Sequence, residues 1–112
     1  MDSFTVNVRE SGPGRFVVAV SGELDLAAAD ALWTRLEPLI EDRAVIVLDG
    51  TGLKFLDSSG LRVLLRAASG ARQNGAVFRL VVPEPAVQRV LTLVGADGIL
   101  ETHDDVEAAL GS

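Results

Sequence analysis

The sequence has no cysteine, no tyrosine and only one histidine among its 112 residues. The absence of cysteine excludes disulfide bonds and thiol chemistry. A single histidine, His103, cannot build a multi-histidine metal site. Aromatic residues make up 4% of the chain, and its one tryptophan, Trp33, falls on the apolar stripe of an expected helix. We therefore interpret Trp33 as a core anchor and not as a platform for a ligand.

Basic residues are also scarce, with 10 Lys and Arg against 16 Asp and Glu and a net charge of −6. Binding to nucleic acid without sequence preference requires a basic surface, so we expect no nucleic-acid partner. A protein partner that carries a basic patch fits this charge better. No apolar run approaches the roughly 20 residues of a membrane-spanning helix. The N-terminus lacks the basic and apolar regions of a signal peptide, so we expect a cytoplasmic protein without a membrane partner.

The composition is that of a globular protein, because 48% of the residues are hydrophobic and 23% are charged. The length suits one domain over residues 1–112. Alternating and helical patterns predict strands over residues 4–9, 15–20, 44–48, 76–82 and 99–100. They predict helices after Asp25, from residue 61 to about residue 73, from Pro85 and after Thr102. Pro38 should split a last turn from the first helix, and residues 49–52 read as a loop.

The order of these elements predicts an α/β fold. Strands that alternate with helices pair in parallel through right-handed crossovers. The first two strands are joined by a short turn, so the N-terminal strand should be antiparallel and lie at an edge. If each new strand adds beside the last, the crossover helices fall mainly on one face of the mixed, mostly parallel sheet.

Residues 55–61, Phe-Leu-Asp-Ser-Ser-Gly-Leu, stand between an apolar strand and a helix. Open α/β sheets place binding sites at such strand ends. A serine there could simply cap the helix, a contribution of about 1 kcal/mol. Phosphorylation of Ser58 would instead add roughly 1.5 to 2 negative charges, which a helix N-terminus tolerates. The hypothesis is that Ser58 is a phosphorylation switch.

A phosphate on Ser58 would act on a neighbouring protein surface. Asp57, and Asp25 or Glu23 from the preceding loop, would concentrate negative charge and repel a partner fitted to a neutral hydroxyl. Arg62 lies four residues from Ser58 on the same helix face and could engage the phosphate or an acid of the partner. Gly60 leaves space where a partner must approach closely. The predicted partner-binding residues are Glu23, Asp25, Asp57, Ser59, Gly60 and Arg62.

The same residues reveal a resemblance to a known family. The motifs are Gly-Glu-Leu-Asp at residues 22–25, Val-Leu-Asp at 47–49, the stretch at 55–61, and Pro-Ala-Val at 85–87 with Leu91 before Gly95. Together they resemble the STAS domain of bacterial anti-sigma factor antagonists over nearly the whole chain. Asp-Ser-Ser-Gly alone is a weak signal, and its position after Gly-Glu-Leu-Asp and an apolar strand makes it specific. The resemblance implies the STAS version of the α/β fold.

The resemblance also implies a function. In that family the first serine of Asp-Ser-Ser-Gly is phosphorylated by an anti-sigma factor that is also a serine kinase, and a serine phosphatase reverses the modification. The unphosphorylated antagonist binds the anti-sigma factor and frees the sigma factor. Carried over, Ser58 is the acceptor, Asp57 the acid beside it, Asp25 part of the docking surface and Ser59 a structural cap. No cofactor is expected, because ATP would belong to the kinase; Lys54 stands where many relatives have an uncharged residue.

Three other interpretations compete with the switch. Asp49 ends an apolar strand, as in a response-regulator receiver, but the acidic pair and the lysine that a receiver needs are missing. A hydrolase would need His103 as its base, and Ser58 lacks the Gly-x-Ser-x-Gly elbow. The nearest alternative is a STAS adaptor that does not switch, in a stressosome-like or lipid-transport complex.

Overall fold

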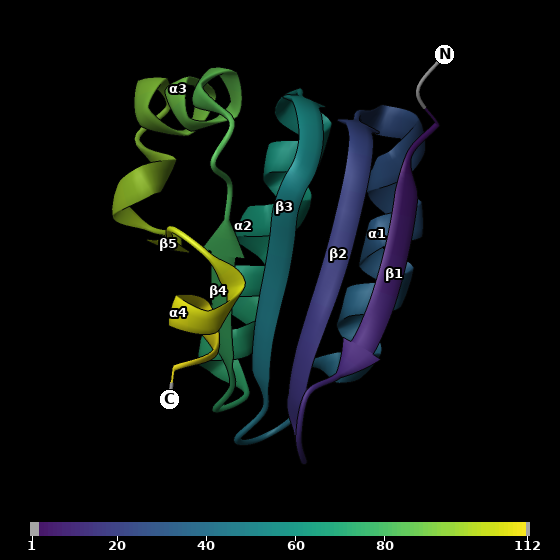
Figure 1. Ribbon diagram of the computed structural model, residues 1–112, viewed down its shortest axis with the longest axis vertical. Helices are drawn as coiled ribbons and strands as arrows, with labels where there is room; N and C mark the ends of the chain where they lie inside the picture. Colours follow the sequence, from purple (N-terminus) through teal and green to yellow (C-terminus); the bar gives the residue numbers. More distant parts are fainter. Residues whose placement is uncertain (1–2, 112) are drawn as a thin grey trace.

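The computed structural model describes residues 3–111, which form a five-stranded sheet in the order β1-β2-β3-β4-β5 (Figure 1). The strands are β1 (Thr5–Glu10), β2 (Arg15–Leu24), β3 (Val45–Leu56), β4 (Val77–Val81) and β5 (Glu101–His103). β1 is antiparallel to β2, and all other neighbours are parallel. The predicted mixed sheet with an antiparallel N-terminal strand is confirmed. Residues 1, 2 and 112 of the expected domain lie outside the described residues.

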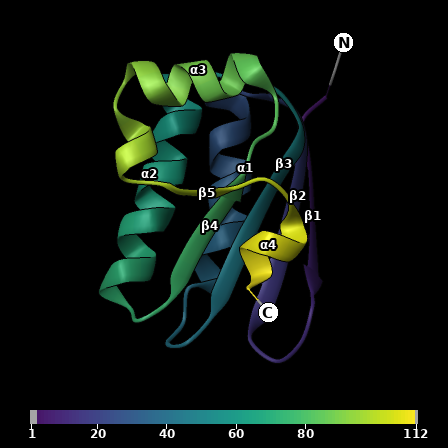
Figure 2. The same cartoon turned by 60° about the vertical axis from the view of Figure 1, so that its left-hand side comes forward.

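The helices are distributed unequally between the two faces of the sheet. They are α1 (Leu26–Leu36), α2 (Ser58–Gln73), α3 (Pro85–Leu93) and α4 (Val106–Leu110), with 3₁₀ turns η1 (Glu37–Leu39) and η2 (Ala96–Gly98). The three crossover helices α1, α2 and α3 bury their apolar sides in one core, whereas α4 lies on the opposite face (Figures 1 and 2). The prediction that the crossover helices share one face is therefore confirmed, and η1 is the last turn expected at Pro38.

The centre of the sheet is buried from both sides. Ile46 and Leu48 of β3 point into the main core, and Val47 between them packs with Val17 and Val81 under Ala109 of α4. All three residues of β3 are fully buried. The run of consecutive apolar residues in β3 follows from this double covering.

Two strands extend beyond their predicted ends. β2 continues to Leu24 and β3 to Leu56, so residues 49–52 belong to a strand and their interpretation as a loop is wrong. The Asp-Gly-Thr-Gly sequence is typical of a turn, but here the two strands pair in parallel over these residues, with register shifts near Ala19 and Gly22. Long-range pairing thus overrides local propensity.

The C-terminal elements also differ from the prediction. The last strand is Glu101–His103 and not residues 99–100, because Ile99 and Leu100 follow the short η2 turn, which the sequence did not reveal. The helix expected after Thr102 begins only at Val106, because Asp105 caps it: the Asp105 Oδ1 accepts a hydrogen bond from the Ala108 N–H at 2.8 Å.

Candidate functional site

β2 and β3 end side by side, and an aspartate follows each strand. Leu24 pairs with Leu56 in the parallel register, so the next residues, Asp25 and Asp57, occupy equivalent positions. Each caps a helix: the Asp25 carboxylate accepts the Ala28 N–H at 3.1 Å, and the Asp57 carboxylate accepts the N–H three residues further on at 3.0 Å. Two helix N-termini, each with free N–H groups and a positive dipole end, therefore lie next to each other at this edge.

The cap of α2 differs from the sequence interpretation. The helix begins at Ser58 and not near residue 61, and Asp57 is its N-cap with an extended backbone (φ −104°, ψ −173°). Ser59 is therefore the second helical residue, and its expected role as a cap is wrong. Ser58 is the first helical residue and its side chain is exposed, whereas Ser59 is half-buried. Because the Asp57 carboxylate is the cap, capping of α2 does not depend on the Ser58 hydroxyl.

Gly60 faces inward, so the expectation that it leaves space for a partner is wrong. The residue is buried, and a Cβ there would lie 2.7 Å from side-chain carbons of both Leu24 and Leu56. These are the last residues of β2 and β3. Gly60 thus allows the first turn of α2 to approach the two strand ends closely.

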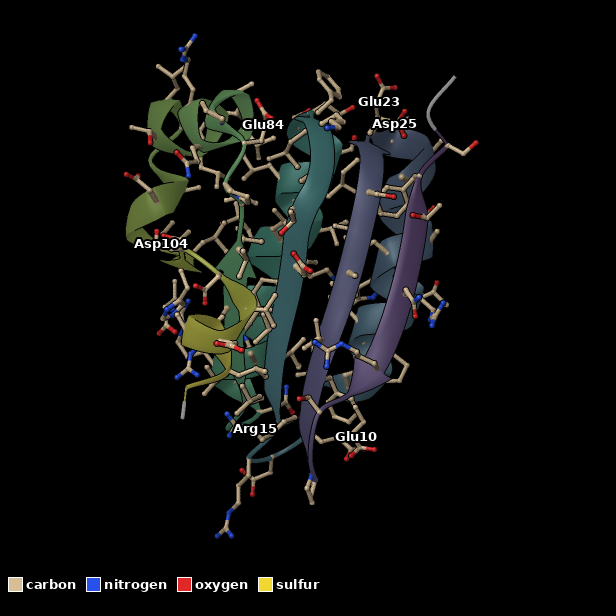
Figure 3. The ribbon with its side chains drawn as sticks, viewed as in Figure 1. Glu10, Arg15, Glu23, Asp25, Glu84 and Asp104 are labelled. Atoms are coloured by element: carbon tan, nitrogen blue, oxygen red, sulfur yellow. The ribbon has the colours of Figure 1, made fainter. Side chains whose placement is uncertain are left out.

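Glu23 is placed by a distortion of β2. Gly22 before it has a φ of 93°, in the left-handed region, at one of the register shifts between β2 and β3. Glu23 is exposed and, with Asp25 and Phe4, lines a depression of about 260 Å³ beside the start of α1. Figure 3 shows Glu23 and Asp25 together at the carboxyl end of β2 and β3, with Glu84 at the same end of the molecule. Glu23 and Asp25 therefore lie at the edge of the sheet where β3 ends and α2 begins.

Two exposed apolar side chains lie in the same region, and sequence reasoning missed both. Leu26 is the first residue of α1, the position that Ser58 holds in α2, and is 74% exposed. Phe55 pairs with Glu23 in the register and is 48% exposed. Leu26 falls outside the apolar stripe of α1, and this position could have identified it as a surface residue. Exposed apolar groups beside polar ones are typical of protein-binding surfaces.

Trp33 is not a fully buried core anchor. It is half-buried and packs against the main core, while the guanidinium carbon of Arg66 lies 4.0 Å from the centre of its ring. Arg62, one turn earlier on α2, is also exposed. Both arginines and Trp33 line a groove between α1 and α2. Ser58 and Arg62 are four residues apart on α2 and both are exposed, so they share one face of the helix.

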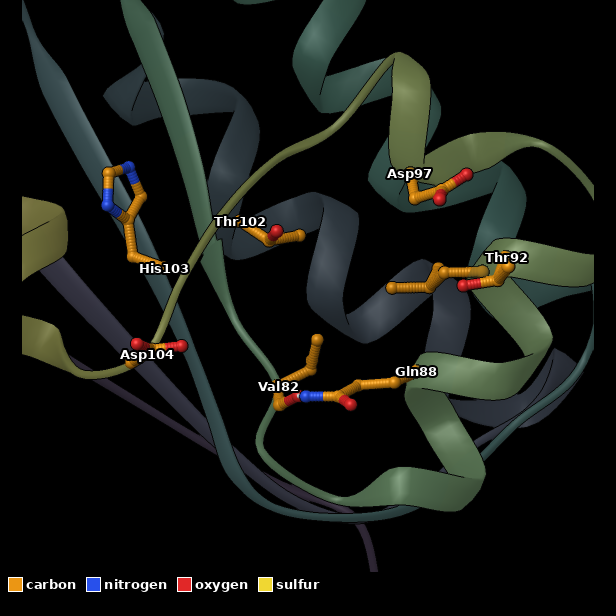
Figure 4. A pocket seen from close by; sticks show the side chains of 8 residues that line it. Val82, Gln88, Thr92, Asp97, Thr102, His103 and Asp104 are labelled. Carbon is orange, nitrogen blue, oxygen red and sulfur yellow. The ribbon is translucent and has the colours of Figure 1, made fainter.

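A separate cavity of about 300 Å³ lies between α3, η2 and β5 (Figure 4). Val82 and Leu91 form its apolar part, and its polar side chains include Gln88 and His103. Gln88 donates a hydrogen bond to the Val82 carbonyl at 2.8 Å. The sequence did not indicate this cavity, and it contains none of the residues predicted around Ser58.

The geometry gives little support to the hydrolase and receiver interpretations. His103 lies on the edge strand β5, where its Nε2 is 2.9 Å from a carboxylate oxygen of Glu101, and β4 separates β5 from the strand that leads to Ser58. Asp49 does not end its strand: it lies within β3 and bonds the Thr51 hydroxyl and N–H. Within residues 3–111 no three His, Cys, Asp or Glu side chains are grouped to hold a metal ion.

Comparison with known proteins identifies the fold family. The sequence model of the STAS domain matches residues 5–109. The chain belongs to the STAS domain family. This STAS domain is 33% identical over 99 residues to the anti-sigma F factor antagonist of Paenibacillus polymyxa, which covers 87% of the chain and 85% of that relative.

Solved structures agree with this assignment. The STAS domain superimposes on an anti-sigma factor antagonist from Mycobacterium paratuberculosis with a TM-score of 0.81 and 33% identity, covering 97% of this chain and 92% of the other. SpoIIAA in its unphosphorylated form gives a TM-score of 0.76 at 21% identity, over 93% of this chain and 92% of that one. The Bacillus cell fate determinant SpoIIAA in its phosphorylated form gives 0.71 at 20%, over 93% and 96%. The two SpoIIAA likenesses establish the fold alone.

None of the helices between residues 3 and 111 has the length and apolar character required to span a membrane.

Proposed function

We propose that this STAS domain is an anti-sigma factor antagonist controlled by phosphorylation of Ser58. In its unphosphorylated form it binds an anti-sigma factor and so releases the sigma factor. The anti-sigma factor is also the serine kinase that modifies Ser58, and a serine phosphatase restores binding. Relatives that are 33% identical over most of the chain and carry the name anti-sigma factor antagonist support the general function.

The observation that carries the switch is the division of tasks at the start of α2. Asp57 accepts the hydrogen bond from the Gly60 N–H, so the exposed Ser58 hydroxyl is left for a kinase. A phosphate on the first helical residue would lie near N–H groups that have no intrahelical acceptor and near the positive end of the helix dipole. Modification should therefore preserve the fold and change only the surface.

The effect on binding follows from the surrounding charge. Glu23, Asp25 and Asp57 gather at this edge, and a phosphate adds roughly 1.5 to 2 further negative charges. A partner that fits a neutral hydroxyl beside these carboxylates would meet like charge, which costs several kcal/mol. Glu23, Asp25, Asp57, Ser59 and Arg62 are the proposed contact residues, and Gly60 supports the surface from inside.

In this proposal the chain is a binding protein and not an enzyme. It needs no cofactor of its own, since ATP is bound by the kinase. It acts in the cytoplasm, where the sigma factor and its inhibitor meet, without nucleic acid or membrane as a direct partner. The net charge of −6 is consistent with a protein partner.

The test measures affinity for the cognate anti-sigma factor by calorimetry with Ser58→Ala and Ser58→Asp. We expect Ser58→Ala to bind like the wild type and Ser58→Asp to lose more than about tenfold in affinity, which corresponds to roughly 1.4 kcal/mol. Ser69→Asp is the matched control, because Ser69 is exposed further along α2. Incubation with ATP and the partner, followed by mass spectrometry, should locate phosphate on Ser58 and find none in Ser58→Ala.

Equal affinities of Ser58→Ala and Ser58→Asp would overturn the switch. Such a result, with intact binding of the wild type, would favour the adaptor that does not switch. Loss of binding by Ser69→Asp to the same degree would mean that the effect of charge on α2 is not specific to Ser58.

A further inference from the structure

The groove between α1 and α2 opens beside the predicted phosphorylation site and has a chemistry of its own. It encloses about 150 Å³. The residues that define it are Leu26 and Trp33 from α1, and Ser59, Arg62, Val63 and Arg66 from α2. Ser59 links the groove to the start of α2, so a protein docked over Ser58 reaches the groove without a gap.

Positive charge is concentrated on one wall of this groove. Although the chain carries a net charge of −6, α2 contains three arginines and no acidic residue. Arg62 and Arg66 are both exposed, and within residues 3–111 neither forms an ion pair. The opposite wall contributes one acid, Asp30. The groove is therefore a basic site on an acidic protein, and it is complementary to an acidic segment.

Trp33 orients one of these arginines. The Arg66 guanidinium carbon lies 4.0 Å from the centre of the Trp33 ring, within the range of a cation–π contact. A guanidinium in such a contact keeps N–H groups that can bind a carboxylate with two hydrogen bonds. Arg66 thus loses little side-chain freedom when it binds an anion.

Leu26 adds an apolar anchor at the end of the groove nearest to Ser58. Its side chain is 74% exposed, although it follows the Asp25 cap at the first position of α1. In the parallel register the start of α1 lies beside the start of α2. A partner that covers the Ser58 hydroxyl would also cover Leu26, which removes apolar surface from water.

We propose that the groove between α1 and α2 binds an acidic segment of the anti-sigma factor, in which a carboxylate pairs with Arg66 and an apolar side chain packs on Leu26. This inference rests on the proposed function and adds a second contact with its own chemistry. The two parts of the interface then have opposite charges, acidic around Asp25 and Asp57 and basic in the groove. Such an arrangement fixes the orientation of the partner as well as its affinity.

The groove contact is tested by charge reversal with a matched control. Arg66→Glu should weaken binding to the anti-sigma factor by more than about tenfold. Arg72→Glu introduces the same charge change on the same helix outside the groove and should stay within about twofold of the wild type. Leu26→Ser is a second variant that leaves the charge and the Arg66–Trp33 contact unchanged, and it should also weaken binding by about tenfold. Thermal denaturation followed by circular dichroism checks that each variant is folded.

Trp33 provides a direct reporter, because it is the only tryptophan of the chain. In a nitrogen-labelled STAS domain its indole N–H signal should shift when the unlabelled anti-sigma factor is added. Phosphorylated protein should not show the shift. An indole signal that stays in place while amide signals around Ser58 move would overturn the groove contact.

The outcomes separate this inference from the switch. If Ser58→Asp loses binding while Arg66→Glu and Leu26→Ser bind normally, the groove contact is overturned and the switch stands. If the groove variants lose binding while Ser58→Asp binds normally, the groove contact stands and the switch fails. If the groove variants change self-association in analytical ultracentrifugation and leave the affinity for the anti-sigma factor unchanged, the occupant is a second copy and the proposal is wrong.

Discussion

At the scale of single residues, the start of α2 assigns separate tasks to three neighbours. Asp57 caps the helix through its carboxylate, Ser58 exposes its hydroxyl, and Ser59 faces the groove between α1 and α2. Aspartate and serine are both good capping residues, so the sequence alone does not say which of the three performs the task. The position of the strand end decides it, because Leu56 pairs with Leu24 and the next residue must turn into the helix.

This capping geometry predicts that substitutions at Asp57 and Ser59 change the free energy of unfolding by different amounts. Asp57→Ala should lower the free energy of unfolding by about 1 kcal/mol through loss of the cap. Ser59→Ala should change it by less than about 0.5 kcal/mol. Urea denaturation of both variants measures the difference. A cost for Ser59→Ala as large as that for Asp57→Ala would contradict the capping geometry.

Two glycines of α2 give a sharper comparison. A Cβ at Gly60 would lie 2.7 Å from carbons of Leu24 and Leu56, whereas a Cβ at Gly70 would make an ordinary contact of 3.5 Å with Ile40. Gly60→Ala should therefore destabilise the fold by about 1–3 kcal/mol. Gly70→Ala should be neutral or stabilise it by up to about 1 kcal/mol, since alanine favours helix.

Urea denaturation of both variants measures whether each substitution lowers or raises the free energy of unfolding. A stabilising Gly60→Ala would show that the first turn of α2 has room to move away from the strand ends.

At the scale of elements, α4 is held on the sheet by side chains from two strands. The Arg79 guanidinium donates to the Ala109 carbonyl at 2.9 Å, and that of Arg15 donates to the Gly111 carbonyl at 2.8 Å. Arg79 also forms an ion pair with Glu101, which in turn bonds His103. Cations at the last carbonyls of a helix satisfy acceptors that the helix itself leaves free. This short helix thereby covers the valines of the second core cluster.

The Glu101 network predicts a pH dependence of stability. The pKa of Glu101 lies below its ordinary value, first because His103 hydrogen-bonds to it and further because Arg79 bonds and attracts it. Folding lowers this pKa, so the contribution is present above the unfolded pKa of about 4.3 and is lost as the pH falls through the folded value. The side chain is 52% exposed, which limits the contribution to at most about 1 kcal/mol.

We therefore expect Glu101→Gln to be less stable than the wild type near neutral pH and equally stable well below the folded pKa of Glu101. Urea denaturation at both pH values measures this. Glu41→Gln is the control, because Glu41 is exposed and outside both ion pairs. A difference between wild type and Glu101→Gln that persists unchanged in acid would contradict the role of the ionised carboxylate.

At the scale of the whole molecule, the sequence predicted what depends on local periodicity and missed what depends on pairing. The order of strands and helices, the antiparallel first strand and the end of α1 near Pro38 all follow from local patterns. The extension of β3 to Leu56 does not, because Asp-Gly-Thr-Gly is held in a strand by pairing with the neighbouring strands, mainly β2. The last strand was misplaced for a related reason: Ile99 is apolar yet exposed, and strand pairing begins only at Glu101.

The candidate site divides in the same way. Motif position located Ser58, Asp57 and Asp25 along the chain, since each follows a strand that periodicity revealed. The exposed Leu26, the inward-facing Gly60 and the stack of Arg66 on Trp33 required the structure. These features arise where two elements meet, and a single-chain pattern carries no information about which helix lies beside which.

Because the Asp57 carboxylate caps the N-terminus of α2, the fold does not depend on Ser58, the residue that follows. Under the proposed mechanism, one nucleotide change that replaces Ser58 could yield a permanently active or a permanently silent regulator, with no compensating mutation needed to rebuild the scaffold. Signalling behaviour in such a protein can therefore diverge between lineages much faster than its shape.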